Sequence, residues 1–300
     1  MSSSIATRQN DRYALDLLAA QRVLYSEVKR LRRLRTGLTA GAAAGSIALA
    51  SAIEPARVPV GLLSGTGLLL FGLVAAGRER RHRQIAATIQ EEFDTYVFGL
   101  PWNALLADPP PTDLVVRYAN RRRRRVPDRD LTDWYPPPAG GNHVADMLMC
   151  QRVNVSWSTP LHRSWATFLG VVLAALVLAV TVLGVTGPLS GTDLAVAVIA
   201  PLLAPVQGLA EALRDNVVHA RQSARLHAEI LALWRSARDG ATTVTTSDCR
   251  QVQDRLFQLR AAGPLVPDRL YRWRHRPLAD AVQAQVDHLS ARSRSGKELP

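Results

Sequence analysis

Five consecutive arginines, Arg121–Arg125, form the stretch of this chain whose residue type and spacing best suit anion binding, and Trp134 and Tyr135 follow shortly after. An arginine fork holds a phosphate through two parallel N–H donors, and an aromatic face stacks on a base. Three interpretations are open: a solvated helix surface, a contact with anionic lipid, and a nucleotide site. In the third, Arg123, Arg124, Trp134 and Tyr135 are the predicted ligand contacts.

The other reactive side chains do not show the pattern of a catalytic or metal site. The seven histidines lack zinc spacing, and the chain has neither a phosphate-binding glycine loop nor a nucleophile elbow. Glu91, Glu92 and Asp94 lie near many arginines, so ion pairing is favoured over acid–base catalysis. Cys150 and Cys249 are interpreted as packed, reduced thiols. We therefore expect no enzyme activity, no metal and no cofactor.

The longest uncharged stretch, Trp165–Gly187, dominates the elements that must position these residues. At about 1.5 Å per residue its helix would be roughly 33 Å long, enough to cross a hydrocarbon core of about 30 Å. A second apolar run, Leu189–Leu213, follows a short turn, so the two predict an antiparallel hairpin. Gly37–Ile53 and Pro59–Gly77 repeat the pattern near the N-terminus. The predicted fold class is an all-α membrane protein with four transmembrane helices as two hairpins, whose long helices extend into a mainly helical cytoplasmic part.

Small residues and prolines mark two of these spans. Gly37, Gly41 and Gly45 recur every four positions, which allows another helix to approach closely. Pro201 and Pro205 each remove a backbone donor from the last span and bend it. The two prolines are a candidate gating kink, either a hinge or part of a pore lining, and a static kink is the alternative.

The distribution of basic residues predicts the topology. Of 37 lysines and arginines, 8 lie in residues 1–36, 13 in residues 78–164 and 15 after residue 210. The positive-inside rule then places both termini and the central segment in the cytoplasm. The predicted organisation is an amphipathic N-terminal helix (1–36), a first hairpin (37–77), a central cytoplasmic segment (78–164), a second hairpin (165–210) and a cytoplasmic helical region (211–300). Topology and anionic lipid account for the net charge of +12, so no DNA or RNA partner is expected.

Helical stripes are predicted outside the spans. Ile85, Ile89, Phe93 and Val97 have the fourfold spacing of a buried helix face. The segment Asp113–Tyr118 is interpreted as the start of a short strand or helix. Ser247 is the predicted N-cap of a helix that ends near Ala262.

Five stretches, in a fixed order around the spans, resemble a known family. They are RQN (Arg8–Asn10), LLAAQRVLYSEVK (Leu17–Lys29), IQEEFDTYVFGLPWN (Ile89–Asn103), DWYP (Asp133–Pro136) and CQRVNVSW (Cys150–Trp157). The chain resembles the SMODS-associated four-transmembrane effectors, pore-forming effectors of bacterial cyclic-oligonucleotide antiphage systems. The resemblance covers most of the chain, including the plan of two hairpins.

The resemblance implies a multi-pass effector of the bacterial inner membrane that forms a homo-oligomer in contact with lipid. A cyclic oligonucleotide, made when infection is sensed, would open or assemble it, and loss of membrane integrity would end in abortive infection. The family implies no catalytic residues. A membrane-anchored scaffold or sensor that conducts nothing is the alternative function.

Overall fold

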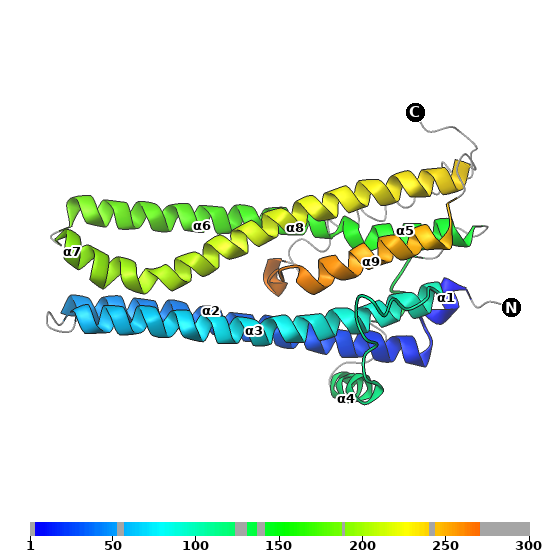
Figure 1. The fold of residues 1–300 in the computed structure, drawn as a ribbon, viewed down its shortest axis with the longest axis horizontal. Helices are drawn as coiled ribbons and strands as arrows, with labels where there is room; N and C mark the ends of the chain where they lie inside the picture. Colours follow the sequence, from blue (N-terminus) through cyan, green and yellow to red (C-terminus); the bar gives the residue numbers. More distant parts are fainter. Residues whose placement is uncertain are drawn as a thin grey trace. The chain divides into compact units, whose positions relative to one another are not determined.

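The computed structural model describes residues 4–52, 57–123, 131–136, 142–187, 190–239 and 244–270. Every regular element in these ranges is a helix, so the predicted all-α class is confirmed (Figure 1). The elements are α1 (Ile5–Arg8), α2 (Arg12–Ala52), α3 (Arg57–Phe98), α4 (Thr112–Arg123), α5 (His143–Ser156), α6 (Ser158–Thr186), α7 (Gly191–Asp193), the π-helix η3 (Leu194–Ile199), α8 (Ala200–Asp239) and α9 (Thr246–Ala262).

The chain divides into two compact units. The first, called the core unit, comprises Met1–Tyr25, Arg83–Arg163 and Val218–Pro300. The second, called the apolar unit, comprises Ser26–His82 and Ser164–Val217. Because α2, α3, α6 and α8 are long, each of them contributes residues to both units.

The core unit encloses a large hydrophobic core. Most of its side chains come from α2, α3, α5, α8 and α9, and α1 and α4 add a few. The predicted stripe on α3 is confirmed, since Ile89, Phe93 and Val97 are fully buried. Leu226 and Ile230 on α8 pack into the same core. Burying one such side chain contributes about 1.5–3 kcal/mol, so the helices of this unit are held together chiefly by packing.

The apolar unit exposes large apolar side chains, whereas the core unit buries most of its own. Large exposed apolar residues occur on each of its four long helices: Leu38 and Leu49 on α2, Leu63, Leu70, Phe71, Leu73 and Val74 on α3, Phe168, Val171, Val177, Leu178 and Val185 on α6, and Ile199 and Leu203 on η3 and α8. Large apolar side chains exposed in such number on neighbouring turns of a helix are typical of a membrane or protein interaction site.

Two helical stretches among the described residues are long and apolar enough to cross a membrane. They are His143–Thr186, with a mean hydropathy of 2.8 in its most apolar window, and Gly191–Arg238, with 1.7. The predicted second hairpin falls within these two stretches. Length and composition support membrane association, and the first hairpin stays a prediction.

The structure decides two of the local predictions. Asp113–Tyr118 forms part of helix α4 and not a strand. Ser247 is not the N-cap of the following helix, because α9 begins at Thr246 with Thr245 as its cap. The Asp248 carboxylate accepts hydrogen bonds from the backbone N–H and the hydroxyl of Thr245, at 2.8 and 2.9 Å. The carboxylate three residues into the helix therefore sets its start, a contact that a search for a single capping hydroxyl overlooks.

Candidate functional site

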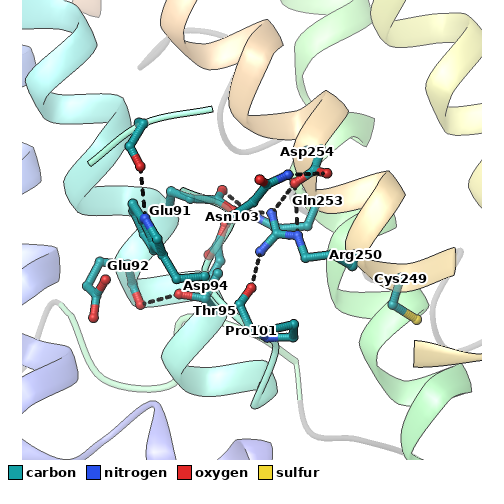
Figure 2. Close-up of polar contacts among 12 residues, drawn as sticks. Glu91, Glu92, Asp94, Thr95, Pro101, Asn103, Cys249, Arg250, Gln253 and Asp254 are labelled. Atoms are coloured by element: carbon teal, nitrogen blue, oxygen red, sulfur yellow. Dashed lines mark hydrogen bonds and ion pairs between the residues drawn. The ribbon is translucent and has the colours of Figure 1, made fainter. Parts of the chain in front are cut away.

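A buried group of charged and polar side chains joins α3 to α9 in the core unit. We call it the buried polar cluster, and it consists of Glu91 and Asp94 on α3, Tyr135, and Arg250, Gln253 and Arg260 on α9. Helical spacing places these residues together: the two carboxylates are three positions apart on α3, and Arg250, Gln253 and Arg260 recur on one face of α9. Figure 2 shows Glu91 and Asp94 facing Arg250 and Gln253.

Hydrogen bonds connect every member of the buried polar cluster. Arg250 forms an ion pair with Glu91, and the Gln253 amide donates to Glu91 Oε2 at 2.8 Å and to Asp94 Oδ2 at 2.9 Å. Arg260 Nη1 donates to Asp94 Oδ2 at 2.5 Å, and the Tyr135 hydroxyl donates to Asp94 Oδ1 at 2.5 Å. Two carboxylates therefore face two guanidiniums, and the predicted ion pairing is confirmed for Glu91 and Asp94. Glu92 accepts a hydrogen bond from the Tyr13 hydroxyl instead.

Arg250 also holds the segment that follows α3. Its Nη1 donates to the carbonyl oxygen of Pro101 at 3.0 Å, and its Nε donates to Asp254 Oδ1 at 2.9 Å. Asn103 donates to the other oxygen of Asp254 at 3.0 Å, as Figure 2 shows. One guanidinium therefore connects α9 with both α3 and the chain that leaves it.

Burial and mutual attraction shift the pKa values of the cluster in opposite senses. Burial raises the pKa of Glu91, and the neighbouring charge of Asp94 raises it further against the hydrogen bonds from Arg250 and Gln253. Burial alone would lower the pKa of Arg260, but attraction to Asp94, Tyr135 and Glu91 outweighs it and raises that pKa. Burial, followed by the charge of Asp94, raises the pKa of Tyr135 well above its ordinary value. The geometry thus keeps the Arg260 guanidinium charged beside the fully buried carboxylate of Asp94.

The chemistry of the cluster is that of a structural ion-pair network. Each carboxylate oxygen at its centre accepts from a neighbouring side chain, which leaves little freedom for proton transfer to a substrate. Cys150 and Cys249 are buried, and burial raises the pKa of both thiols, that of Cys249 to about 12. The prediction of packed, reduced thiols is confirmed, since both cysteines are free and buried. A protonated thiol is also a poor nucleophile. Among the described residues, no group of three His, Cys, Asp or Glu side chains is arranged as metal ligands would be.

Arg123 and Trp134, two of the four predicted ligand contacts, both lie against α2. Arg123 is the last residue of α4, and its Nη1 forms an ion pair with Asp16 on α2. Trp134 is half-buried, with the Arg22 guanidinium carbon 5.3 Å from the centre of its ring and Phe93 edge-on at 6.3 Å. The Trp134 ring therefore already has a cation of the chain itself over its face, the Arg22 guanidinium.

Tyr135 and Arg124 differ from these two. Tyr135 is only 1% exposed; its ring stacks on Phe93 at 6.0 Å, and its hydroxyl belongs to the buried polar cluster. Arg124 lies outside the described residues. A ligand contact by these four residues remains a prediction.

Sequence reasoning missed Arg250, Gln253 and Arg260. A signal existed, because these polar residues interrupt the apolar positions of α9 at helical spacing, beside the buried Val252, Leu256 and Phe257. A charged residue next to a buried stripe needs a charged partner. The sequence did not identify that partner, since Glu91 lies 159 residues from Arg250.

Pro201 and Pro205 lie at the start of α8, directly after the π-helix η3. Pro201 has no N–H to donate, and the N–H of Ala200 bonds to the carbonyl of Ala195, five residues back instead of four. Pro205 lies inside α8 and cannot donate to the carbonyl four residues earlier. The widened turn was not predicted, and it adds a second irregularity next to the two prolines.

A histidine pair lies in the core unit near the start of α6. The rings of His162 and His219 are 4.2 Å apart, both are buried, and His219 Nε2 is 3.0 Å from the hydroxyl of Ser158. Ser223 donates to the same hydroxyl at 3.0 Å. Burial, followed by the charges of His162 and Arg83, lowers the pKa of His219 to about 3.

The core unit should therefore lose stability on acidification. The unfolded chain protonates this imidazole at its ordinary pKa of about 6.5, whereas the folded chain resists protonation down to about pH 3, so stability is full above the unfolded value and falls below it. Between pH 7 and pH 5 we expect a loss of about 2 kcal/mol in the free energy of unfolding. Denaturant titrations of the wild type and His219→Gln at both pH values test this. An equal pH dependence in the two proteins would contradict it.

The described fold and site define a class: an all-helical protein with membrane-type helices, whose polar centre is an ion-pair cluster. Comparison with known protein families identifies the protein more specifically than this class does. The model of the SMODS-associating 4TM effector domain matches residues 3–289, so the chain belongs to this effector family, and the resemblance seen in the sequence motifs is confirmed. The chain is 21% identical over 290 residues to a probable CBASS effector molecule of Bacillus cereus (strain VD146), covering 93% of this chain and 96% of that protein. No solved structure matches.

Proposed function

We propose that this protein is an antiphage effector that forms a pore in, or disrupts, the bacterial inner membrane when a cyclic oligonucleotide binds. Membership of the effector family supports the defence role, as does the name of the Bacillus cereus relative. The proposed outcome is abortive infection, in which loss of membrane integrity stops phage replication.

The exposed apolar surface of the second unit is the observation that carries this proposal. Each of α2, α3, α6 and α8 presents large apolar side chains there, for example Leu73 at 69% exposed on α3 and Val185 at 80% on α6. In water, this exposed apolar surface would favour aggregation, whereas in a membrane it would contact the lipid tails. Four helices with exposed apolar side chains support two spanning hairpins, and the distribution of lysines and arginines supports a cytoplasmic position for both termini.

Assembly of several copies is part of the proposal, because four helices of one chain cannot enclose a wide aqueous path. A Cβ built at Gly37, Gly41 or Gly45 would meet nothing within 4 Å, so this glycine face of α2 is open in the single chain. Such faces allow a second helix to approach closely in a membrane.

The buried polar cluster is the proposed route from sensing to the membrane. Glu91 and Asp94 belong to α3, one continuous helix from Arg57 to Phe98 that also supplies a predicted span. Separating buried ion partners is costly, so α9 and the cytoplasmic end of α3 should move together. A ligand that moves α9 would then act on α3.

Release of dye and ions from liposomes that hold the purified protein tests the proposal. The expected result is release that depends on one member of a panel of cyclic di- and trinucleotides. Protein that is inserted and folded but releases nothing with any of them would favour the alternative function, a membrane-anchored scaffold or sensor.

Pro205→Ala should weaken ligand-dependent release. An alanine restores the N–H that the helix lacks, and a proline inside a helix costs about 3 kcal/mol relative to alanine, so the variant should favour a straighter, closed α8. We expect release to fall about tenfold at equal protein density, with ligand binding unchanged. Ala210→Pro, five residues further along α8, tests whether the position of the proline matters: if proline content alone governs release, this variant should increase release. Unaltered release by Pro205→Ala would leave only the static-kink interpretation.

A further inference from the structure

A groove of about 310 Å³ runs between α8 and α9 in the core unit. Six of its eight lining residues form two trios of the same composition: Gln222, Arg225 and Leu226 on α8, and Arg255, Gln258 and Leu259 on α9. Glu229 and Ala262 complete the lining. Each trio has the spacing of neighbouring positions on one helix face. The groove is therefore lined by two guanidiniums, two amides and two leucines that converge from separate helices.

This combination of side chains suits one unit of a nucleotide. Guanidinium forks bind phosphate oxygens, side-chain amides pair with base edges, and apolar side chains support the flat face of a base. The volume lies at the lower end of the range for small-molecule sites, about 300–1,000 Å³, which suits part of a larger ligand.

We propose that the groove between α8 and α9 binds a phosphate and base of the cyclic oligonucleotide, with Arg225 and Arg255 on phosphate and Gln222 and Gln258 on the base edge. The inference rests on the proposed function, and the site differs from the one predicted around Arg123. It places ligand recognition on the C-terminal helices of the core unit.

Glu229, a further lining residue, is an ion-pair partner that Arg255 can exchange for a phosphate. Its carboxylate forms an ion pair with Arg255, and the two side chains are 51% and 59% exposed. Exposed pairs of this kind contribute little to stability, so an incoming phosphate can replace the carboxylate at Arg255. The released carboxylate can then accept a hydrogen bond from a base amino group.

The groove also has a direct connection to the buried polar cluster. At about 100° per residue, Arg255, Gln258 and Leu259 lie on the face of α9 opposite to Arg250 and Gln253. One helix thus carries the ligand contacts on its outer face and the partners of Glu91 and Asp94 on its inner face. A ligand that draws α9 towards α8 acts directly on the ion pairs with α3.

Binding of cyclic di- and trinucleotides to the full chain in zwitterionic nanodiscs, measured by calorimetry, tests the inference. Arg225→Ala combined with Arg255→Ala should weaken binding at least tenfold. The control Arg221→Ala, on the same helix but outside the groove, should bind within twofold of the wild type. If Arg123→Ala weakens binding and the double variant does not, the ligand occupies the site predicted from the sequence, and the inference is overturned. Nanodiscs with added anionic lipid form a separate arm, in which competition with the nucleotide would identify a lipid headgroup as the occupant and overturn the inference.

A second variant, Ala262→Trp, narrows the groove without removing a charge, since Ala262 lines its end. It should weaken binding as the double variant does, with an unchanged circular dichroism spectrum. If both variants bind the nucleotide as tightly as the wild type, the groove is not the binding site, and the proposed function is unaffected. A wild-type protein that releases liposome contents but binds no nucleotide overturns the proposed gating and, with it, this inference.

Discussion

Replacing Asp94 with alanine should lower the free energy of unfolding of the core unit by about 3–5 kcal/mol. Asp94 is fully buried and accepts hydrogen bonds from Tyr135, Gln253 and Arg260. Its removal leaves the Arg260 guanidinium, whose side chain is 14% exposed, without the carboxylate that it contacts most closely. A buried charge that loses its partner costs more than the pair contributed, which explains the size of the effect. Denaturant titration followed by tryptophan fluorescence measures it.

Two comparison variants separate charge from shape. Asp94→Asn keeps an acceptor for Tyr135 but removes the negative charge. Its free energy of unfolding should therefore lie between those of the wild type and Asp94→Ala. Asp108→Ala removes a carboxylate from an exposed position between α3 and α4 and should change stability by less than about 0.5 kcal/mol. If Asp94→Ala costs no more than Asp108→Ala, the cluster does not hold α9 to α3, and the proposed route to the membrane loses its basis.

Leu178→Arg should abolish stable membrane insertion of α6, or reduce the inserted fraction severalfold. Leu178 lies near the middle of the apolar part of α6 and is 64% exposed. An arginine at the centre of a spanning helix costs about 2.5–3.5 kcal/mol for insertion, whereas the same exchange on a surface in water costs almost nothing. Alkaline extraction of membranes, followed by immunoblotting, measures the inserted fraction.

The chain contains a matched control for this substitution. Leu105 is a leucine of the core unit that is 97% exposed, in the segment between α3 and α4. Leu105→Arg should leave insertion, folding and ligand-dependent release unchanged. Equal insertion of both variants would show that exposed apolar side chains on α6 do not face lipid, and the two-hairpin topology would then have to be abandoned.

Sequence patterns predicted the part of the site that depends on local spacing. Glu91, Glu92 and Asp94 were expected to form ion pairs because arginines are abundant around them, and the structure shows Glu91 and Asp94 paired. The same reasoning selected Tyr135 for its aromatic face and for its position after an arginine run. The structure buries that ring against Phe93 and Phe98 and directs its hydroxyl to Asp94. Residue type indicated that the Tyr135 ring makes an aromatic contact, but only the packing of the core decided that its partners are Phe93 and Phe98.

The sequence by itself determined the helical class, the long apolar stretches and the family, because these depend on composition, periodicity and the order of motifs along the chain. Only the tertiary structure decided which helices meet. Arg250 and Glu91 are separated by 159 residues, and nothing local to either specifies the other. The same holds for the groove, whose polar residues are ordinary solvent-facing positions on two helices until α8 and α9 pack side by side. Pairing of this kind follows from burying apolar faces together, which then fixes the polar partners beside them.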